Sequence, residues 1–272
     1  MNQKPFREER LQRIAELVRE RRKVRVNELA KEFNVSPSSI RMDLAELESL
    51  GLLKRTHGGA IHADALPEQL VIQKPPLELR QITYQDEKMA ISQAAATLIE
   101  DGDTLMIDGG STTIHVARHL SNKRGLTIIT TAISLLPHLM AIPDSQIYVV
   151  GGLLDPKFET LIGDITIDTL ERFRTSKAIL GIDGVSVSVG LSVTNSAVAK
   201  SKQSMMRLSE QVIIVADHTK LAQVALFPIA PLSECDYLVT SSLAPPEVVA
   251  AIERTGTRVL IAPVQANPND DR

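Results

Sequence analysis

The stretch from Val35 to Ala60 reads VSPSSIRMDLAELESLGLLKRTHGGA, and it holds the start of a helix, its end and a basic segment. Ser36 suits the N-cap position, because a serine hydroxyl accepts a hydrogen bond from the first helical turn. Pro37 suits the first helical position, where a missing N–H costs nothing. Gly51 is typical of the residue that follows a helix. The stretch therefore predicts a helix that begins at Pro37 and stops before Gly51.

This helix has two different faces when its residues are placed at 100° per residue. The inward arc is apolar and consists of Ile40, Leu44 and Leu47. The opposite arc consists of Ser38, Met42, Ala45 and Ser49, with Arg41 on its flank. Small polar side chains in a first turn let a backbone approach a partner closely, and Arg41 is long enough to reach a guanine edge or a phosphate. We expect the outward face to contact DNA.

Two further helices precede this one. Apolar residues at helical spacing predict the first from about Arg7 to Arg22, and VNELAKEF predicts a short second helix. Three short helices in this order are typical of a helix-turn-helix, whose last helix enters the major groove by its N-terminal end. The expected contacts from this helix are Ser36, Ser38, Ser39, Arg41 and Met42. The alternative is an ordinary three-helix bundle with an exposed third helix.

The segment LLKRTHGGAIH after the third helix predicts two short strands that turn on or near Gly58-Gly59. Such a wing would offer Lys54, Arg55 and His57 to phosphates. Residues 1–62 carry 13 Lys and Arg against 9 Asp and Glu, whereas the rest of the chain carries 17 against 24. A basic head on an acidic body favours a polyanionic partner for the head. We assign residues 1–62 to this domain.

Residues 63–85 are predicted to form a linker. Helical periodicity fades there, and Pro67, Pro75 and Pro76 interrupt the chain. The proline pair stiffens the connection, which has room for a short helical piece.

Residues 86–265 alternate between helical and strand patterns. Short apolar segments, which predict strands, are TLMID, LTIITT, QIYVV, KAILGID, QVIIVAD, DYLVT and RVLIA. Nearly continuous apolar strands separated by helices indicate an α/β domain with a largely parallel sheet. Residues 266–272 are a polar tail.

Polar motifs follow several of these strands, where α/β folds bind ligands. The segment DGGSTT, Asp108 to Thr113, joins a strand to a helix start and suits an anion, although such loops also serve as simple turns. It matches neither a P-loop nor the dinucleotide fingerprint. The candidate residues of this phosphorylated-ligand site are Asp108, Gly109, Gly110, Ser111, Thr112, Thr113, Thr130, Thr131, Gly151, Gly152, Asp183, Gly184, Lys202, Asp217 and Lys220. In the alternative interpretation, Asp183 caps a turn and Asp217 with Lys220 forms a surface pair.

Other classes of protein find no support in the sequence. No His, Asp and Glu spacing suggests a metal, no cofactor is expected, and His115 and His138 are interpreted as helix-surface residues. A lone Cys235 excludes an intramolecular disulfide or a cysteine zinc cluster. No apolar run approaches the roughly 18 residues of a membrane span. The N-terminal segment is charged rather than a signal peptide, so we expect a cytoplasmic protein.

The segment from Glu9 to Ala60 resembles the winged helix-turn-helix of the DeoR family of bacterial sugar-metabolism regulators. That family usually has Thr-Ile-Arg-Arg-Asp-Leu where this chain has SIRMDL, so Met42 replaces a basic residue. The resemblance extends to about residue 262, where the body is similar to the family's sugar-phosphate sensor domain. It implies a fold related to ribose-phosphate isomerases and CoA-transferases.

The same resemblance implies that Asp108 to Thr113 form the phosphate loop. It also implies that Asp183, Lys202, Asp217 and Lys220 line the pocket. The family commonly has a Glu two residues before the lysine that matches Lys202, and this chain has Lys200 there. The isomerase relatives use a nearby carboxylate as a base, so this departure favours binding without turnover.

Two functions remain to be compared. The first is a transcription regulator, usually a repressor, that binds double-stranded operator DNA and responds to a phosphorylated sugar or sugar-like effector. The second is an isomerase or CoA-transferase-like enzyme with an appended helical domain. An enzyme would need a placed general base or a nucleophilic carboxylate, and none stands out, so no catalytic residue is assigned. The regulator is preferred, and two half-sites require a homodimer or homotetramer.

Overall fold

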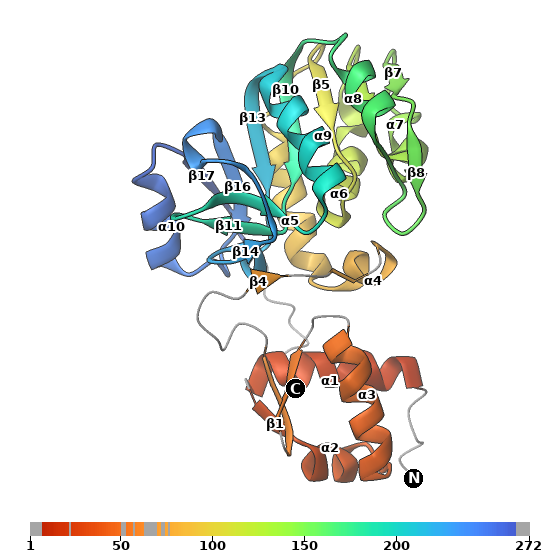
Figure 1. Ribbon diagram of the computed structural model, residues 1–272, viewed down its shortest axis with the longest axis vertical. Coiled ribbons are helices and arrows are strands. Elements are labelled where there is room, and N and C mark those ends of the chain that lie inside the picture. The colour runs from red at the N-terminus through yellow and green to blue at the C-terminus, as the bar shows by residue number, and fades with distance from the viewer. Residues whose placement is uncertain are drawn as a thin grey trace. The chain divides into compact units, whose positions relative to one another are not determined.

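The structure is a computed structural model that describes residues 7–21, 23–49, 53–56, 58–62, 70–71, 74–75 and 77–264. The chain divides into two compact units (Figure 1). The N-terminal unit comprises Met1–Gln69 with Gln73–Pro75, and the C-terminal unit comprises Leu70–Ile72 with Pro76–Arg272. The polar tail and much of the expected linker lie outside the described residues. None of the described helices is long and apolar enough to cross a membrane.

The N-terminal unit packs three helices against a small antiparallel sheet. Its elements are α1 (Arg7–Arg21), β1 (Lys23–Arg25), α2 (Val26–Glu32), α3 (Pro37–Ser49), β2 (Leu53–Thr56) and β3 (Gly59–His62). The sheet order is β1-β3-β2, so β1 joins the hairpin expected from the sequence. A Cβ at Gly59 would lie 1.9 Å from the carbonyl oxygen of Val24 on β1. Glycine at this position therefore lets β3 approach β1.

The third helix has the two faces that the sequence predicts. Ile40, Leu44 and Leu47 are buried in the core of the unit, and Met42 is 66% exposed. The N–H of Ser39 donates to the hydroxyl of Ser36 at 3.2 Å, which confirms Ser36 as the N-cap.

The C-terminal unit is an α/β fold built on a parallel sheet. The strands of that sheet are β5 (Thr104–Ile107), β6 (Thr127–Thr130), β7 (Gln146–Val149), β10 (Thr175–Gly181), β13 (Ser209–Val215), β16 (Tyr237–Ser241) and β17 (Arg258–Ala262). Its neighbouring strands all pair in parallel. The expected α/β fold class is confirmed, and every strand segment named from the sequence lies in this sheet.

The sheet order β17-β16-β13-β10-β5-β6-β7 contains a topological switch point. From β5 the chain proceeds to β6 and β7 on one side, and then crosses to β10 on the other side of β5. The connections after β5 and β10 therefore lead away from each other at the carboxyl edge. In open α/β sheets this is where a ligand crevice forms.

Helices cover both faces of the sheet, as Figure 1 shows for the C-terminal unit. They are α4 (Leu77–Ile82), α5 (Gln85–Ala96), α6 (Ser111–His119), α7 (Leu136–Leu139), α8 (Asp164–Leu170), α9 (Ser196–Arg207) and α10 (Pro246–Glu253). The helices α4, α5, α6 and α7 pack in one apolar core with Leu105 and Ile107 of β5. The helices α8, α9 and α10 pack in a second core with Met106 of β5. Successive residues of β5 thus point to opposite faces, as the pleat requires.

Smaller sheets lie in the connections that follow the carboxyl ends of the large-sheet strands. A hairpin joins β8 (Leu153–Asp155) to β9 (Thr160–Ile162), and β11 (Gly184–Ser186) and β12 (Gly190–Val193) pair with β15 (Phe227–Ala230). In addition, β4 (Leu70–Val71) pairs with β14 (Val224–Ala225). Two elements within the stretch expected to be a linker, β4 and α4, therefore belong to the C-terminal unit.

Candidate functional site

The segment from Asp108 to Thr113 runs from the carboxyl end of β5 into α6. Its glycines have extended or ordinary backbone angles, and Gly109 is needed for space: a Cβ there would lie 2.9 Å from the Cβ of Ala132. Thr113 donates its hydroxyl hydrogen to the carbonyl of Gly110 at 3.1 Å. The first N–H groups of a helix have no intrahelical acceptor. Ser111 and Thr112 therefore offer N–H groups and hydroxyls together at one helix start.

Asp108 and Lys202 bridge the switch point. The N–H of Gly181, the last residue of β10, lies 3.1 Å and 3.2 Å from the two carboxylate oxygens of Asp108. Lys202 on α9 forms an ion pair with Asp108 and donates to the carbonyl of Gly181 at 2.9 Å. Both charged side chains are buried. This pair therefore ties β5, β10 and α9 together at the edge where the loop lies.

Other expected site residues have structural contacts. The hydroxyl of Thr130 donates to the carbonyl of Ile107 at 2.7 Å, and Thr131 contacts Thr160 of the β8–β9 hairpin. A Cβ at Gly152 would collide with Thr166 of α8, and one at Gly184 would lie 2.7 Å from Ser192.

Gly151 accepts a hydrogen bond from Thr166 at 2.8 Å. The described contacts thus tie Gly151 and Gly152 to α8, and Gly184 to the small sheet.

Asp183 and Asp217 follow β10 and β13 and are both buried, so the surface-pair interpretation of Asp217 is wrong. Asp183 accepts hydrogen bonds from the N–H and the hydroxyl of Thr194 at 3.0 Å and 3.1 Å, as a turn-capping carboxylate does. Asp217 accepts from the N–H of Thr219 at 3.1 Å. Burial alone would raise the pKa of Asp217, but nearby Lys220 and Lys88 outweigh burial and lower it to about 2. Asp217 is therefore ionised at neutral pH.

Two cations not anticipated from the sequence, Lys88 and Arg80, lie near these carboxylates. The ammonium of Lys88 on α5 lies 3.9 Å from Asp217, and both side chains are buried. Burial lowers the pKa of Arg80 on α4, whereas the charges of Asp183 and Asp217 act in the opposite direction. Arg80 also lies over the ring of Phe158 in the β8–β9 hairpin, 5.6 Å from its centroid. Cations from α4 and α5 thus gather on the carboxylates at the sheet edge.

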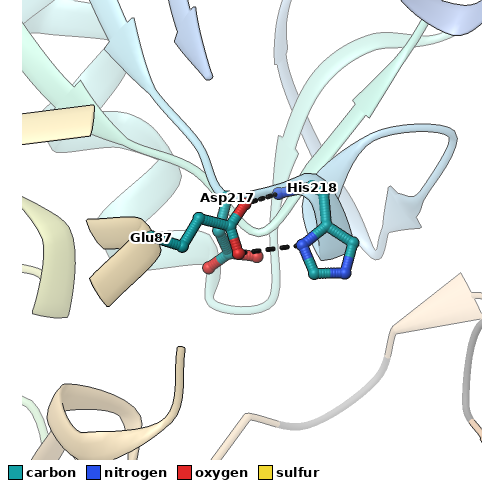
Figure 2. Close-up of side chains that lie close together, drawn as sticks. All are labelled: Glu87, Asp217 and His218. Carbon is teal, nitrogen blue, oxygen red and sulfur yellow. Dashed lines mark hydrogen bonds and ion pairs between the residues drawn. The ribbon is translucent and has the colours of Figure 1, made fainter. Parts of the chain in front are cut away.

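Glu87 is a further buried carboxylate that the sequence analysis missed. It accepts from the backbone N–H of His218 at 2.7 Å, lies 2.8 Å from His218 Nδ1, and accepts from Ser241 at 2.6 Å. Figure 2 shows Glu87, Asp217 and His218 close together, with the two contacts from His218 to Glu87 drawn. One signal was present in the sequence: Glu87 lies four and eight residues before Ile91 and Ala95, on the apolar face of its helix.

Glu87, Asp217 and His218 have ligand atoms within 4.8 Å of one another, a spacing that could hold a metal ion. The contacts of this cluster do not favour a metal. Both oxygens of Glu87 already accept hydrogen bonds, and the ammonium of Lys88 supplies positive charge beside Asp217. The cluster instead fixes the chain after β13 against α5.

His115 on α6 and His138 on α7 differ in burial. His115 is buried, so its interpretation as a helix-surface residue is wrong, whereas His138 is half-buried. Burial, with the nearby charge of Arg118, lowers the pKa of His115 to about 4. His115 is therefore neutral at physiological pH. Burial also raises the pKa of Cys235 to about 12, which fits an unreactive thiol.

The residues of the third helix that are expected to contact DNA are mostly exposed. Ser36, Ser38, Arg41 and Met42 are exposed, and Ser39 is half-buried. Arg55 on β2 forms an ion pair with Glu48 at 2.6 Å, so its guanidinium is already engaged. The side chain of Lys54 and the whole of His57 lie outside the described residues.

The chain thus combines a helical unit, which has a capped, polar-faced third helix and a hairpin, with an α/β unit built on a parallel sheet, as a DNA-binding regulator with a second domain does. Residues 10–65 match the DeoR-like helix-turn-helix domain, and residues 83–242 match the DeoR C terminal sensor domain. The chain belongs to the DeoR family.

Three of the chain's relatives are transcriptional repressors by name. The chain is 33% identical to the transcriptional repressor AccR of Agrobacterium fabrum, over 86% of this chain and 90% of that protein. It is 32% identical to the repressor GlcR of Bacillus subtilis, over 94% and 96%. It is 35% identical to the glycerol-3-phosphate regulon repressor of Escherichia coli, over 86% and 90%. A ribose 5-phosphate isomerase A from Methanocaldococcus jannaschii has a TM-score of 0.37, with 16% identity over 52% of this chain and 55% of that one.

Proposed function

We propose that this protein represses a carbohydrate-metabolism operon from the cytoplasm by binding double-stranded operator DNA. A phosphorylated sugar or related metabolite, bound by the C-terminal unit, would modulate that binding. Membership of the DeoR family supports this proposal. The name of the Escherichia coli relative, a glycerol-3-phosphate regulon repressor, supports a phosphorylated effector.

One observation carries the effector assignment. At the switch point, the N–H groups and hydroxyls of Ser111 and Thr112 open α6, and the cations of α4, α5 and α9 gather on the same sheet edge. Helix N-termini bind phosphate through N–H groups, and ammonium groups add charge. The buried Asp183 and Asp217 offer acceptors of the kind that sugar hydroxyls require.

Binding without turnover is part of the proposal. The buried carboxylates at this edge already have partners: Asp108 has Lys202, Asp183 has Thr194, Asp217 has Thr219, and Glu87 has His218 and Ser241. Lys200, where the family commonly has a carboxylate, is exposed on α9. Purified protein given pentose and hexose phosphates should leave them unchanged by NMR. Turnover at roughly 1 per second or faster would favour the enzyme alternative.

We further propose that the protein acts as a homodimer or homotetramer. Each protomer supplies one recognition helix, and tight binding to a duplex normally engages two half-sites. Binding of the purified protein to fragmented genomic DNA, followed by sequencing, should recover sites with two half-sites. Recovery of single half-sites by a monomeric protein would contradict this proposal.

A further inference from the structure

The buried ammonium of Lys88 holds the end of α4. It donates to the carbonyl of Arg80 at 2.7 Å and also to the carbonyl of Thr83. The last carbonyls of a helix have no intrahelical donor, so a side-chain cation there satisfies groups that would otherwise be bare. Lys88 therefore caps α4 from the neighbouring helix α5.

An ammonium has three N–H donors, and α4 takes two of those of Lys88. The nearest charged acceptor for the third is Asp217, whose carboxylate oxygen lies 3.9 Å away. This distance is too long for a direct hydrogen bond, although the two groups form an ion pair. Among the described residues, the hydrogen bonds of the Lys88 ammonium therefore account for two of its three donors.

We propose that Lys88 binds the anionic group of the effector with this third donor while its other two donors hold α4. This inference rests on the proposed function, and it adds a binding residue together with the route by which occupancy is transmitted. The ligand class is a phosphorylated sugar-like metabolite, because a phosphate oxygen accepts from an ammonium donor and the nearby charges of Arg80 and Lys220 also favour an anion.

The position of α4 in the chain makes this contact a means of communication. The N-terminal unit includes Gln73–Pro75, and α4 begins at Leu77, so α4 is the first helix after the chain leaves that unit. Leu77 is buried in the core shared by α5 and α6, and Arg80 contacts Phe158. A ligand that fixes Lys88 also fixes the carbonyls of α4, and through them the segment that leads to the DNA-binding unit.

Hydrogen–deuterium exchange of the full-length protein tests this proposal, with inorganic phosphate and ribose 5-phosphate as probes. In the parent protein, a bound probe should slow exchange of the amides of residues 79–83. Lys88→Met keeps the length of the side chain and removes its charge. It should weaken probe binding at least about tenfold, as expected for loss of a charge-assisted hydrogen bond, and abolish the response of α4.

Two further variants separate the roles of Lys88. Lys88→Gln keeps a donor for the α4 carbonyls but not the charge, so it should retain more protection of α4 without probe than Lys88→Met and still bind the probe weakly. Lys200→Met removes an exposed lysine of α9 and should behave as the parent does. Exchange of the central sheet strands shows that each variant is folded.

The outcomes distinguish this inference from the proposed function. If the parent binds neither these probes nor any other phosphorylated sugar or polyol, the proposed function fails and the role of Lys88 fails with it. If the parent binds a probe, and both Lys88 variants bind it equally well with the same change in α4, the role of Lys88 alone is overturned.

Discussion

Lys88 also illustrates how a single buried charge affects stability. Burial is the largest cause that lowers its pKa, to about 8 from an ordinary value of 10.5, and Asp217 only partly opposes it. A shift of this size corresponds to about 3 kcal/mol of unfavourable free energy for the charged form. The cost is fully present below pH 8, where both the folded and unfolded states carry the charge.

Between about pH 8 and 10.5 the folded protein loses this proton while the unfolded chain keeps it, so this group's contribution to stability rises with pH. Lys88→Met removes that contribution. The free energy of unfolding of the parent relative to the variant should therefore increase over this window, by up to about 3 kcal/mol, in urea denaturation at several pH values. A difference that stays flat with pH would contradict a buried, charged Lys88.

Arg41 and Lys54 of the DNA-binding unit should affect binding in different ways. Arg41 is exposed on α3, and its replacement by Ala should cost about 1–3 kcal/mol and relax base preference if it reads a base. Lys54→Ala should weaken binding to all DNA sequences alike and reduce the salt dependence of that binding. Fluorescence anisotropy with operator and scrambled duplexes at several salt concentrations measures both. Operator binding by both variants that matches the parent would refute the assignment of this surface.

At the level of elements, the N-terminal unit depends on a buried ion pair. Arg10 on α1 lies 2.7 Å from Asp43 on α3, with side chains 11% and 1% exposed. Asp43→Ala leaves the Arg10 charge buried without its partner, which typically costs about 3–5 kcal/mol. The midpoint temperature for unfolding of this unit should therefore fall, as measured by calorimetry. Glu32→Ala, which removes an exposed pair with Arg21, is the matched control and should cost about 1 kcal/mol or less.

The start of α6 provides a second test at this scale. Ser111→Ala with Thr112→Val removes two hydroxyls at the helix start and leaves the Thr113 contact with Gly110 intact. Calorimetric titration should show loss of phosphorylated-ligand binding with unchanged operator affinity. Thr97→Val, on an exposed residue after α5, is a control that should bind as the parent does. Normal ligand binding by the double variant would show that the effector does not bind at the start of α6.

Elements with a strong pattern were predictable, and those without one were not. The strands of the large sheet are apolar runs between helices, so each could be named from the sequence. The strands β1, β8 and β9 have three residues each, so none of them has a periodic signal. Glu87 and Lys88 were missed because charged residues in a helix are normally solvated. Only the fold shows that this turn of α5 faces Asp217 and His218.

The candidate site also has parts that were predictable from the sequence and parts that were not. The loop Asp108–Thr113 and the carboxylates after β10 and β13 could be placed, because parallel strands bring their carboxyl ends to one edge. Sequence could not separate ligand-facing groups from structural ones, since partners such as Thr166 for Gly152 are distant in the chain. Nor could it reveal Arg80, which comes from a segment without periodicity.

At the scale of the whole molecule, one short segment of the chain connects the DNA-binding unit to the sensor unit. The sensor unit can change operator affinity only by the difference in free energy with which the effector binds the two conformational states. The contacts of α4 with Lys88 and Phe158 place this segment beside the site. Effector binding and operator binding should therefore alter each other by the same factor.

The most direct test of the central claim is operator affinity measured with and without phosphorylated sugars. Genomic binding supplies the operator, and a panel of phosphorylated sugars and polyols supplies the effector. We expect at least one compound to change the operator affinity of the parent protein several-fold. We also expect the Ser111→Ala, Thr112→Val protein to bind the operator equally well and not to respond. If no phosphorylated compound has an effect, or if the variant responds as the parent does, the account is contradicted.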